Sequence, residues 1–287
     1  MDYVNKEALV STEWLARHLA APDVRVVDAS WFMPALKRDA AAEYASQHVP
    51  GAVFFDIDEI ADAANPLPHM LPSAEKFSAR VRRLGLGDGN RIIVYDSAMM
   101  ASAARVWWTF RAFGHDDVAV LDGGFRKWLR EGRPVESEAP PPRERHFTAR
   151  FNHALVRELE EVRGNIGSGR EQVLDARSRG RFAGSEPEPR ASLRGGHIPG
   201  SRNLPFDLLV DSASGTMKPA TEIKRLFAEA GVDLARPIVT SCGSGVTASL
   251  LAFGLYLIGH EAAAVYDGSW TEWGGRADTP VETGAGA

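Results

Sequence analysis

The sequence contains the same series of short motifs twice. Four motifs in the first half recur in the same order in the second half, and the offset between partners stays between 145 and 149 residues. A chance similarity would not keep its offset over four motifs, so we predict two homologous domains in this 287-residue chain. The motifs lie at residues 26–29, 48–52, 91–96 and 121–128, and again at residues 173–176, 197–201, 237–242 and 266–273.

A proline-rich segment lies between the two copies. Three consecutive prolines at residues 140–142 impose an extended path, and the charged residues around them favour solvent. A long surface loop within a single domain is the alternative, but the repeat lies on both sides of the segment. We therefore predict an N-terminal domain at residues 1–135, a linker at residues 136–151 and a C-terminal domain at residues 152–287.

Short apolar runs alternate with longer amphipathic segments in each copy. Residues 24–27, 92–95 and 118–121 are rich in β-branched side chains, which is typical of buried strands. This alternation predicts an α/β fold for each domain, with a mainly parallel sheet covered by helices on both faces.

Two of the amphipathic segments have apolar residues at helical spacing. They cover residues 73–84 and 221–230. Each begins at a residue that can cap a first helical turn, Ser73 in one case and Thr221 in the other.

Composition and charge argue against several classes of protein. The net charge of −5 and the pI of about 5.9 are unlike a nucleic-acid-binding domain, which carries a basic stripe. Residues 1–10 lack the basic start and apolar core of a secretory signal. The longest apolar run, residues 248–258, is too short to cross a membrane. We expect a cytoplasmic protein with no nucleic-acid or membrane partner.

The single cysteine, Cys242, follows an apolar strand and precedes a glycine-containing loop and a helix. We expect Gly243 and Gly245 to allow backbone angles closed to other residues, so that successive N–H groups turn toward one point. The amino end of the helix points its dipole at the same place. Such a cradle stabilises a thiolate, the nucleophilic form of cysteine. The alternative is an inert cysteine buried at a tight turn.

Two other chemistries fit the cysteine less well. A cysteine phosphatase has an arginine at the sixth position after its cysteine, where this chain has Ala248. No Cys/His cluster has the spacing of a zinc site, so we expect no metal.

The chain resembles the tandem-domain rhodanese and 3-mercaptopyruvate sulfurtransferase family over residues 9–282. The resemblance rests on residues 242–247 (CGSGVT), on the two His-Val/Ile-Pro-Gly segments and on residues 266–270 (YDGSW). It implies an active site between two doubly wound domains, with no cofactor. It also implies a catalytic C-terminal domain and a silent N-terminal domain, in which Asp96 occupies the place of Cys242.

The loop after the cysteine separates the sulfur donors used in this family. Members that prefer thiosulfate resemble Cys-Arg-Lys-Gly-Val-Thr, whereas Gly243 and Ser244 are neutral here. Two cations would suit the thiosulfate dianion, while mercaptopyruvate carries its carboxylate at a distance from its thiol. The resemblance thus favours mercaptopyruvate, with a thiol, thioredoxin or cyanide as acceptor. A thiosulfate sulfurtransferase and a non-enzymatic sulfur carrier or binding module are the alternatives.

The resemblance also assigns residues to the donor. Arg181 and Arg190 would bind its carboxylate and keto group, since an arginine fork donates two parallel hydrogen bonds. Otherwise the two arginines merely balance Glu186 and Glu188 on a solvated loop. Arg177 and Arg179, on the same segment, are expected to be surface or structural residues. The resemblance further gives catalytic roles to Ser244 and Asp58 and a donor contact to His69, although the residues alone would make Asp58 a capping or turn residue and His69 a loop residue.

The remaining predicted contacts lie in the cysteine loop. We expect Gly243, Gly245, Val246 and Thr247 to contact the donor or the persulfide, with a cap of the following helix as the alternative for Thr247.

Overall fold

Each half of the chain forms its own five-stranded parallel sheet in the computed structural model, which describes residues 2–141 and 143–286. The strand orders, β1-β5-β4-β2-β3 and β6-β10-β9-β7-β8, are the same once the second set is renumbered. The first sheet contains β1 (Leu9–Val10), β2 (Val24–Asp28), β3 (Ala52–Phe54), β4 (Arg91–Tyr95) and β5 (Val118–Leu121). The second contains β6 (Val156–Arg157), β7 (Gln172–Asp175), β8 (Arg202–Asn203), β9 (Ile238–Ser241) and β10 (Ala264–Tyr266).

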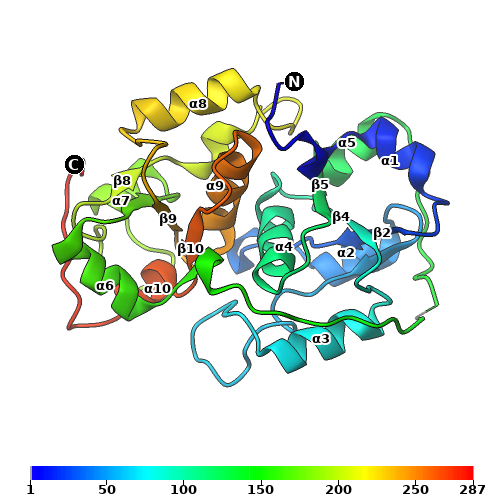
Figure 1. Ribbon diagram of the computed structural model, residues 1–287, viewed down its shortest axis with the longest axis horizontal. Helices are drawn as coiled ribbons and strands as arrows, with labels where there is room; N and C mark the ends of the chain where they lie inside the picture. Colours follow the sequence, from blue (N-terminus) through cyan, green and yellow to red (C-terminus); the bar gives the residue numbers. More distant parts are fainter. Residues whose placement is uncertain (1, 142, 287) are drawn as a thin grey trace.

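Helices cover both faces of each sheet (Figure 1). Along β4, Ile92 and Val94 pack in one core cluster, whereas Ile93 and Tyr95 pack in another on the opposite face. The predicted α/β fold with two tandem domains is confirmed. The helices are α1 (Thr12–His18), α2 (Ala40–Ser46), α3 (Ala74–Arg83), α4 (Ala101–Ala112), α5 (Gly124–Arg130), α6 (Leu159–Ser168), α7 (Arg179–Ala183), α8 (Ala220–Glu229), α9 (Val246–Leu257) and α10 (Ser269–Trp273), with short 3-10 turns at Lys6–Ala8, Pro34–Leu36, His153–Leu155 and Phe206–Leu209.

The two predicted helix caps have different outcomes. Ser73 caps α3 as predicted, because its hydroxyl accepts the N–H of Lys76 at 3.2 Å. The prediction for Thr221 is wrong. Helix α8 begins one residue earlier, at Ala220, after Pro219, whose extended backbone leads the chain into the first turn.

The two domains pack through α4 and α9, which lie side by side at the centre of the molecule (Figure 1). Helix α9 is apolar on nearly its whole surface, so it needs cover on every side. Trp107 of α4 supplies part of that cover, with its ring 4.8 Å from the ring of Phe253 and 5.2 Å from that of Tyr256. No helix of the described residues is long and apolar enough to cross a membrane.

Two carboxylates join the domains in a near-symmetric way. Asp267, which follows β10, accepts the N–H of Leu71 in the first domain at 2.8 Å. Asp122, which follows β5, accepts the N–H of Met217 in the second domain, also at 2.8 Å. The repeat therefore extends to the contacts between the domains. Asp267 also has a buried ion pair with Arg105 at 2.7 Å, and no such pair is recorded for Asp122 in the described residues.

The two Pro-Gly turns each carry a buried histidine, and the linker starts beside the first of them. His48 stacks on Tyr44 at 4.1 Å and His197 stacks on Phe182 at 3.8 Å, so both have the structural role expected of a motif shared by the two copies. The backbone of His48 pairs with that of Glu136 in an isolated bridge. The domain and linker boundaries remain predictions.

Burial without an ion pair makes the folding contribution of Asp122 depend on pH. Burial raises the pKa of Asp122 from 3.8 to about 6, although the Met217 N–H and Lys127 act in the opposite direction. Since the folded state binds this proton more tightly than the unfolded state, Asp122 favours folding below about pH 4 and loses that contribution as the pH rises through 6.

Replacing Asp122 with Asn should remove this dependence while keeping an oxygen for the Met217 N–H. Relative to the parent protein, the free energy of unfolding of Asp122→Asn should rise by about 2–3 kcal/mol between pH 4 and pH 7. Urea unfolding at the two pH values measures this difference. A difference that stays constant with pH would mean that Asp122 titrates normally.

Candidate active site

The cysteine loop is fixed from behind by the start of α10. Cys242 is 2% exposed and lies between β9 and α9. The N–H of Trp270 donates to its carbonyl at 2.9 Å. At the next carbonyl, Gly243 accepts both the N–H of Thr271 at 2.9 Å and its hydroxyl at 2.6 Å. These contacts leave the loop little freedom on the α10 side.

Ser269 holds the amide of the cysteine itself. Its buried hydroxyl accepts the N–H of Cys242 at 3.1 Å and donates to the carbonyl of Tyr266 at 2.7 Å. Ser269 has a φ of 49°, a left-handed conformation that costs a non-glycine residue about 1–2 kcal/mol. The first copy has Gly124 at the equivalent position, the first residue of α5, with a φ of 56°. Ser269 thus has a strained backbone conformation, and its side chain makes a hydrogen bond to the cysteine amide that a glycine could not make.

The two glycines of the loop are needed for different reasons. Gly245 has a φ of 78°, as the sequence predicted, and a side-chain carbon there would lie 2.7 Å from Nη1 of Arg105. The backbone argument is wrong for Gly243, which is outside the left-handed region. Its lack of a side chain matters for space instead, because a Cβ there would lie 3.2 Å from Nη2 of Arg181.

The first copy shows what the cradle binds. The carboxylate of Asp96, at the position of Cys242, accepts three backbone N–H groups and one hydroxyl at 2.8–3.0 Å. No cation pairs with this 2% exposed carboxylate among the described residues, so backbone dipoles and the hydroxyl stabilise it. The donors are the N–H groups of Ala98, Met100 and Ala103 and the hydroxyl of Ser102.

The equivalent cradle at Cys242 suits an anion at the same distance from the backbone. An Asp oxygen lies two bonds beyond Cβ, as does the outer sulfur of a cysteine persulfide. Thr247 is the second residue of α9 and Ser102 is the second residue of α4, so Thr247 has a hydroxyl at the matching position. The side chains of Ser244 and Thr247 make no recorded hydrogen bond to the described residues, and both are half-buried.

Replacing Asp96 with Ala should leave its buried donors without an acceptor. We expect the free energy of unfolding to fall by about 3 kcal/mol. Asp56 is a matched control, since its exposed carboxylate also accepts two backbone N–H groups, and Asp56→Ala should cost below about 1 kcal/mol. Urea unfolding of both variants measures the difference, and equal losses would contradict the role given to the cradle.

The first domain brings Asp58 and His69 together. Nδ1 of His69 lies 2.8 Å from Oδ1 of Asp58, and Nε1 of Trp31 donates to the other oxygen at 2.9 Å. The hydrogen bond from His69 lowers the pKa of Asp58, and the charge of Arg190 from the second domain adds to the effect. The sequence resemblance named these residues for one site, and the structure joins them directly.

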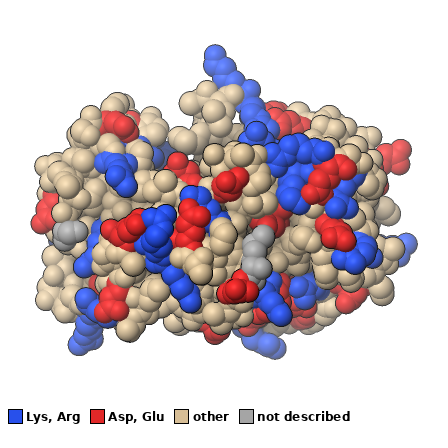
Figure 2. Space-filling view, turned by 90° about the horizontal axis from the view of Figure 1, so that it is seen from above, with Lys and Arg blue, Asp and Glu red and all other residues tan. Residues whose placement is uncertain are grey.

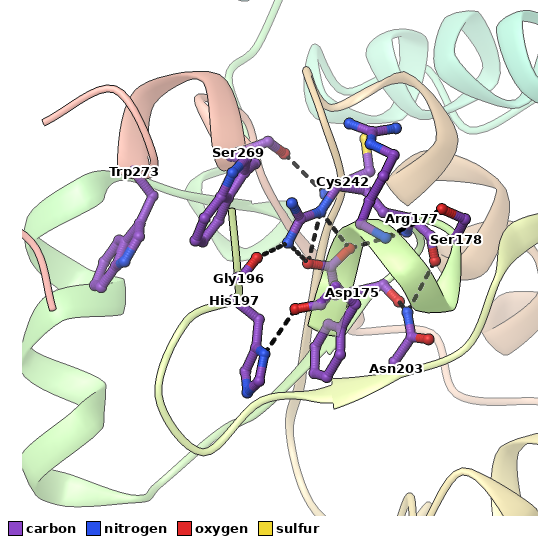
Figure 3. A network of polar contacts seen from close by, with 12 residues as sticks. Asp175, Arg177, Ser178, Gly196, His197, Asn203, Cys242, Ser269 and Trp273 are labelled. Atoms are coloured by element: carbon purple, nitrogen blue, oxygen red, sulfur yellow. Dashed lines mark hydrogen bonds and ion pairs between the residues drawn. The ribbon is translucent and has the colours of Figure 1, made fainter. Parts of the chain in front are cut away.

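Arg181 is committed to a buried carboxylate. Its Nε and Nη2 donate to the two oxygens of Glu188 at 3.2 and 2.7 Å. Glu188 also accepts Nη1 of Arg177. Arg177 in turn holds Asp175 through Nε and Nη2 (Figure 3). Arg177 is fully buried, so of the two predicted roles for it the structural one is correct. Glu188 does more than balance charge on a solvated loop, because it orients Arg181.

Arg190 is available for a ligand. It is exposed, and its Nη1 donates to Thr271 Oγ1 at 3.3 Å, which links it to the cysteine loop. No carboxylate lies within ion-pair distance of Arg190 in the described part of the chain.

The sequence did not indicate functional roles for Trp31, Arg105, Glu188 or Ser269. Only the difference between Ser269 and Gly124 in otherwise matching motifs was a usable signal. Within residues 2–141 and 143–286, no three His, Cys, Asp or Glu side chains are grouped as metal ligands. A cavity of about 690 Å³ beside α7 and α8 does not include Cys242 and is no part of this site.

Charges on the surface are intermixed. On the face shown in Figure 2, Lys and Arg side chains alternate with Asp and Glu. Mixed charge of this kind gives no field of one sign across that face.

Comparisons with known proteins agree with the site. The family model of the rhodanese-like domain matches residues 11–131 and 158–276. The chain is 47% identical to human 3-mercaptopyruvate sulfurtransferase, over 94% of this chain and 93% of that protein. It is 46% identical to rat thiosulfate sulfurtransferase, over 96% and 94% respectively.

A solved structure gives the same result for the fold. The 3-mercaptopyruvate sulfurtransferase SseA from Escherichia coli superposes with a TM-score of 0.84 at 38% identity, covering 92% of this chain and 98% of that one. With two matched domains, two matching sheets and a cysteine in the second cradle only, the chain belongs to the rhodanese-like domain family.

Proposed function

We propose that this protein is a sulfurtransferase that moves sulfur from 3-mercaptopyruvate to an acceptor through a persulfide on Cys242. The observation that carries the proposal is the cradle around Cys242, whose counterpart in the first copy holds the carboxylate of Asp96. The nucleophile forms a covalent intermediate, so the reaction divides into two steps.

In the first step the Cys242 thiolate attacks the donor sulfur. A sulfur–sulfur bond forms and the carbon–sulfur bond of mercaptopyruvate breaks, with its electron pair leaving on pyruvate as the enolate. The thiol proton of the donor passes to the enolate carbon, which gives pyruvate and leaves the persulfide as an anion. Ser244, Asp58 and His69 are the groups suited to relay this proton, since the last two are paired at 2.8 Å.

The cradle then stabilises the persulfide. The proposed donors are the backbone N–H groups of Gly243, Gly245 and Val246 and the hydroxyl of Thr247. For Gly245 and Thr247 the proposal is supported by the equivalent contacts of Met100 and Ser102 with Asp96. In the second step a thiol, thioredoxin or cyanide attacks the outer sulfur and restores the thiolate. No metal or organic cofactor is required for either step.

Loop chemistry supports mercaptopyruvate as the preferred donor. Identity alone does not separate the two activities, because the relatives named for each are 47% and 46% identical to this chain. Gly243 and Ser244 carry no charge beside the sulfur, whereas thiosulfate is a dianion. Arg190 lies on a separate segment and has no carboxylate partner among the described residues, so it suits a carboxylate distant from the reacting sulfur. Arg181 adds positive potential, and its hydrogen bond to Glu188 fixes the direction of its side chain.

We place the protein in the cytoplasm as a prediction, although an Arabidopsis relative that is 42% identical is named as mitochondrial. A thiosulfate sulfurtransferase is the second candidate, since relatives with that name match almost the whole chain.

Replacing Cys242 with Ser should abolish transfer and leave the fold intact. Pyruvate release from mercaptopyruvate and thiocyanate formation from thiosulfate and cyanide, measured on one preparation, test the activity and the donor together. The parent protein should prefer mercaptopyruvate, and its intact mass should increase by one sulfur atom after donor treatment. A preference for thiosulfate would overturn the donor assignment, while no sulfur uptake from either compound would favour a carrier or binding module.

Replacing Arg190 with Ala should weaken donor binding more than the chemical step. We expect KM for mercaptopyruvate to rise about 10–100-fold, because a charged hydrogen bond to the carboxylate is lost. Arg179 on the same segment is a control, since it makes no recorded ion pair with the described residues. Steady-state kinetics of both variants decide the role, and an unchanged KM in Arg190→Ala would remove it.

A further inference from the structure

A buried arginine of the N-terminal domain, Arg105, lies between the loop that follows Cys242 and the loop that carries His69. Arg105 of α4 has a side chain only 3% exposed, with its guanidinium 4.5 Å above the ring of Trp108. Its Nη1 lies 2.7 Å from Oδ1 of Asp267, and its Nη2 donates to the carbonyl of His69. Burying such a pair costs free energy of hydration, which is offset only where the geometry is good and further hydrogen bonds are made.

We propose that Arg105 is a positioning residue for sulfur loading at Cys242, acting through His69 and through the cysteine loop. The inference rests on the proposed function and adds a residue of the catalytically silent domain to it. It concerns the backbone of His69, which is distinct from the side-chain contact between His69 and Asp58.

The Arg105–Asp267 pair holds the backbone that directly follows the His69 side chain, from the carbonyl of His69 to the N–H of Leu71. Arg105 binds the carbonyl of His69, and Oδ2 of Asp267 accepts the N–H of Leu71 at 2.8 Å. His69 has a φ of 62°, which is unfavourable for a non-glycine residue and persists only where surrounding contacts require it. The two contacts therefore fix the direction in which the imidazole leaves the backbone, and so its approach to Asp58.

The same guanidinium sets the shape of the cysteine loop. A side-chain carbon at Gly245 would lie 2.7 Å from Nη1 of Arg105, so the loop passes against the cation without space between them. The carbonyl of Asp267 lies 3.0 Å from the same point. The loop that follows Cys242 in one domain and the loop that carries His69 in the other thus contact the same buried ion pair.

The second carboxylate contact between the domains, from Asp122 to Met217, shows that packing alone does not require a buried arginine such as Arg105. Asp122 accepts the N–H of Met217 at 2.8 Å, just as Asp267 accepts that of Leu71. The fifth residue of the 12-residue helix α4 is Arg105, while the fifth residue of the equally long α9 is Leu250. Among the described residues, a buried cation is paired with the interdomain carboxylate at Asp267, beside the cysteine loop, and not at Asp122.

The test compares Arg105→Met, the double variant Arg105→Met/Asp267→Asn and the control Asp122→Asn. The single variant leaves the charge of Asp267 buried without a partner and should lose stability. The double variant removes both charges, and the amide oxygen of the new asparagine should still accept the N–H of Leu71, so its stability should recover. Asp122→Asn changes the equivalent contact between the domains, which lies away from Cys242.

Single-turnover sulfur loading from mercaptopyruvate is followed by intact mass, and the alkylation of Cys242 by iodoacetamide is followed in parallel. We expect loading by the double variant to slow by on the order of 10–100-fold, because His69 is no longer held in place. Alkylation should change by less than about threefold and thermal stability should remain close to that of the parent. Asp122→Asn should load sulfur at the parent rate.

Hydrogen–deuterium exchange at residues 69–71 provides a readout without turnover. It should become faster in the double variant and stay unchanged in Asp122→Asn. Parent-like loading with parent-like exchange in the double variant would overturn the role of Arg105, as would a loss of loading that matches an equal loss of alkylation. A parent protein that takes up no sulfur would instead refute the proposed function, and the exchange data would still decide whether Arg105 positions the loop.

Discussion

The packing of α4 against α9 is the interaction on which the site depends. Each helix follows the cradle of its own domain, so bringing the two helices together also brings the two cradles to one interface. Helix α9 is apolar nearly all round and cannot be exposed without a large loss of buried surface. Because Cys242 lies in one domain and the Asp58–His69 pair in the other, separating the helices would separate the cysteine from the pair that we propose as its proton relay.

Within this shared frame, the two copies differ at a few positions that matter for chemistry. Asp96 fills its own cradle with a carboxylate, whereas we propose that the equivalent place beside Cys242 holds a second sulfur atom. Gly124, the first residue of α5, adopts a left-handed backbone conformation without strain. Ser269 adopts the same conformation at a cost, and its hydroxyl accepts the N–H of Cys242. On this proposal the first copy is the same kind of anion site with its ligand built in. In both copies the carbonyl at this position accepts an N–H from the helix behind it, that of Phe125 at Asp96 and that of Trp270 at Cys242.

The repeat, the strands and the cysteine loop could be predicted from the sequence because each depends on local order along the chain. The pairing of Asp58 with His69 came only through resemblance, since the two lie 11 positions apart in an irregular loop and no periodicity links them. Arg105 was missed for another reason. It lies in an apolar helix, and its carboxylate partner, Asp267, belongs to the other domain. Sequence patterns report which face is buried, but not which distant charge meets a buried cation.

Charge pairing in the site bears on which donor it suits. Arg105 is matched by Asp267, and Arg181 shares Glu188 with Arg177, which is itself held by Asp175. These groups are neutral in sum, so they orient side chains without creating strong positive potential. Among the described residues of the site, Arg190 is the arginine without a carboxylate partner. In the proposed mechanism, this single cation on a segment separate from the cysteine loop matches one carboxylate of the donor better than it matches a compact dianion that must bring both charges to the cysteine.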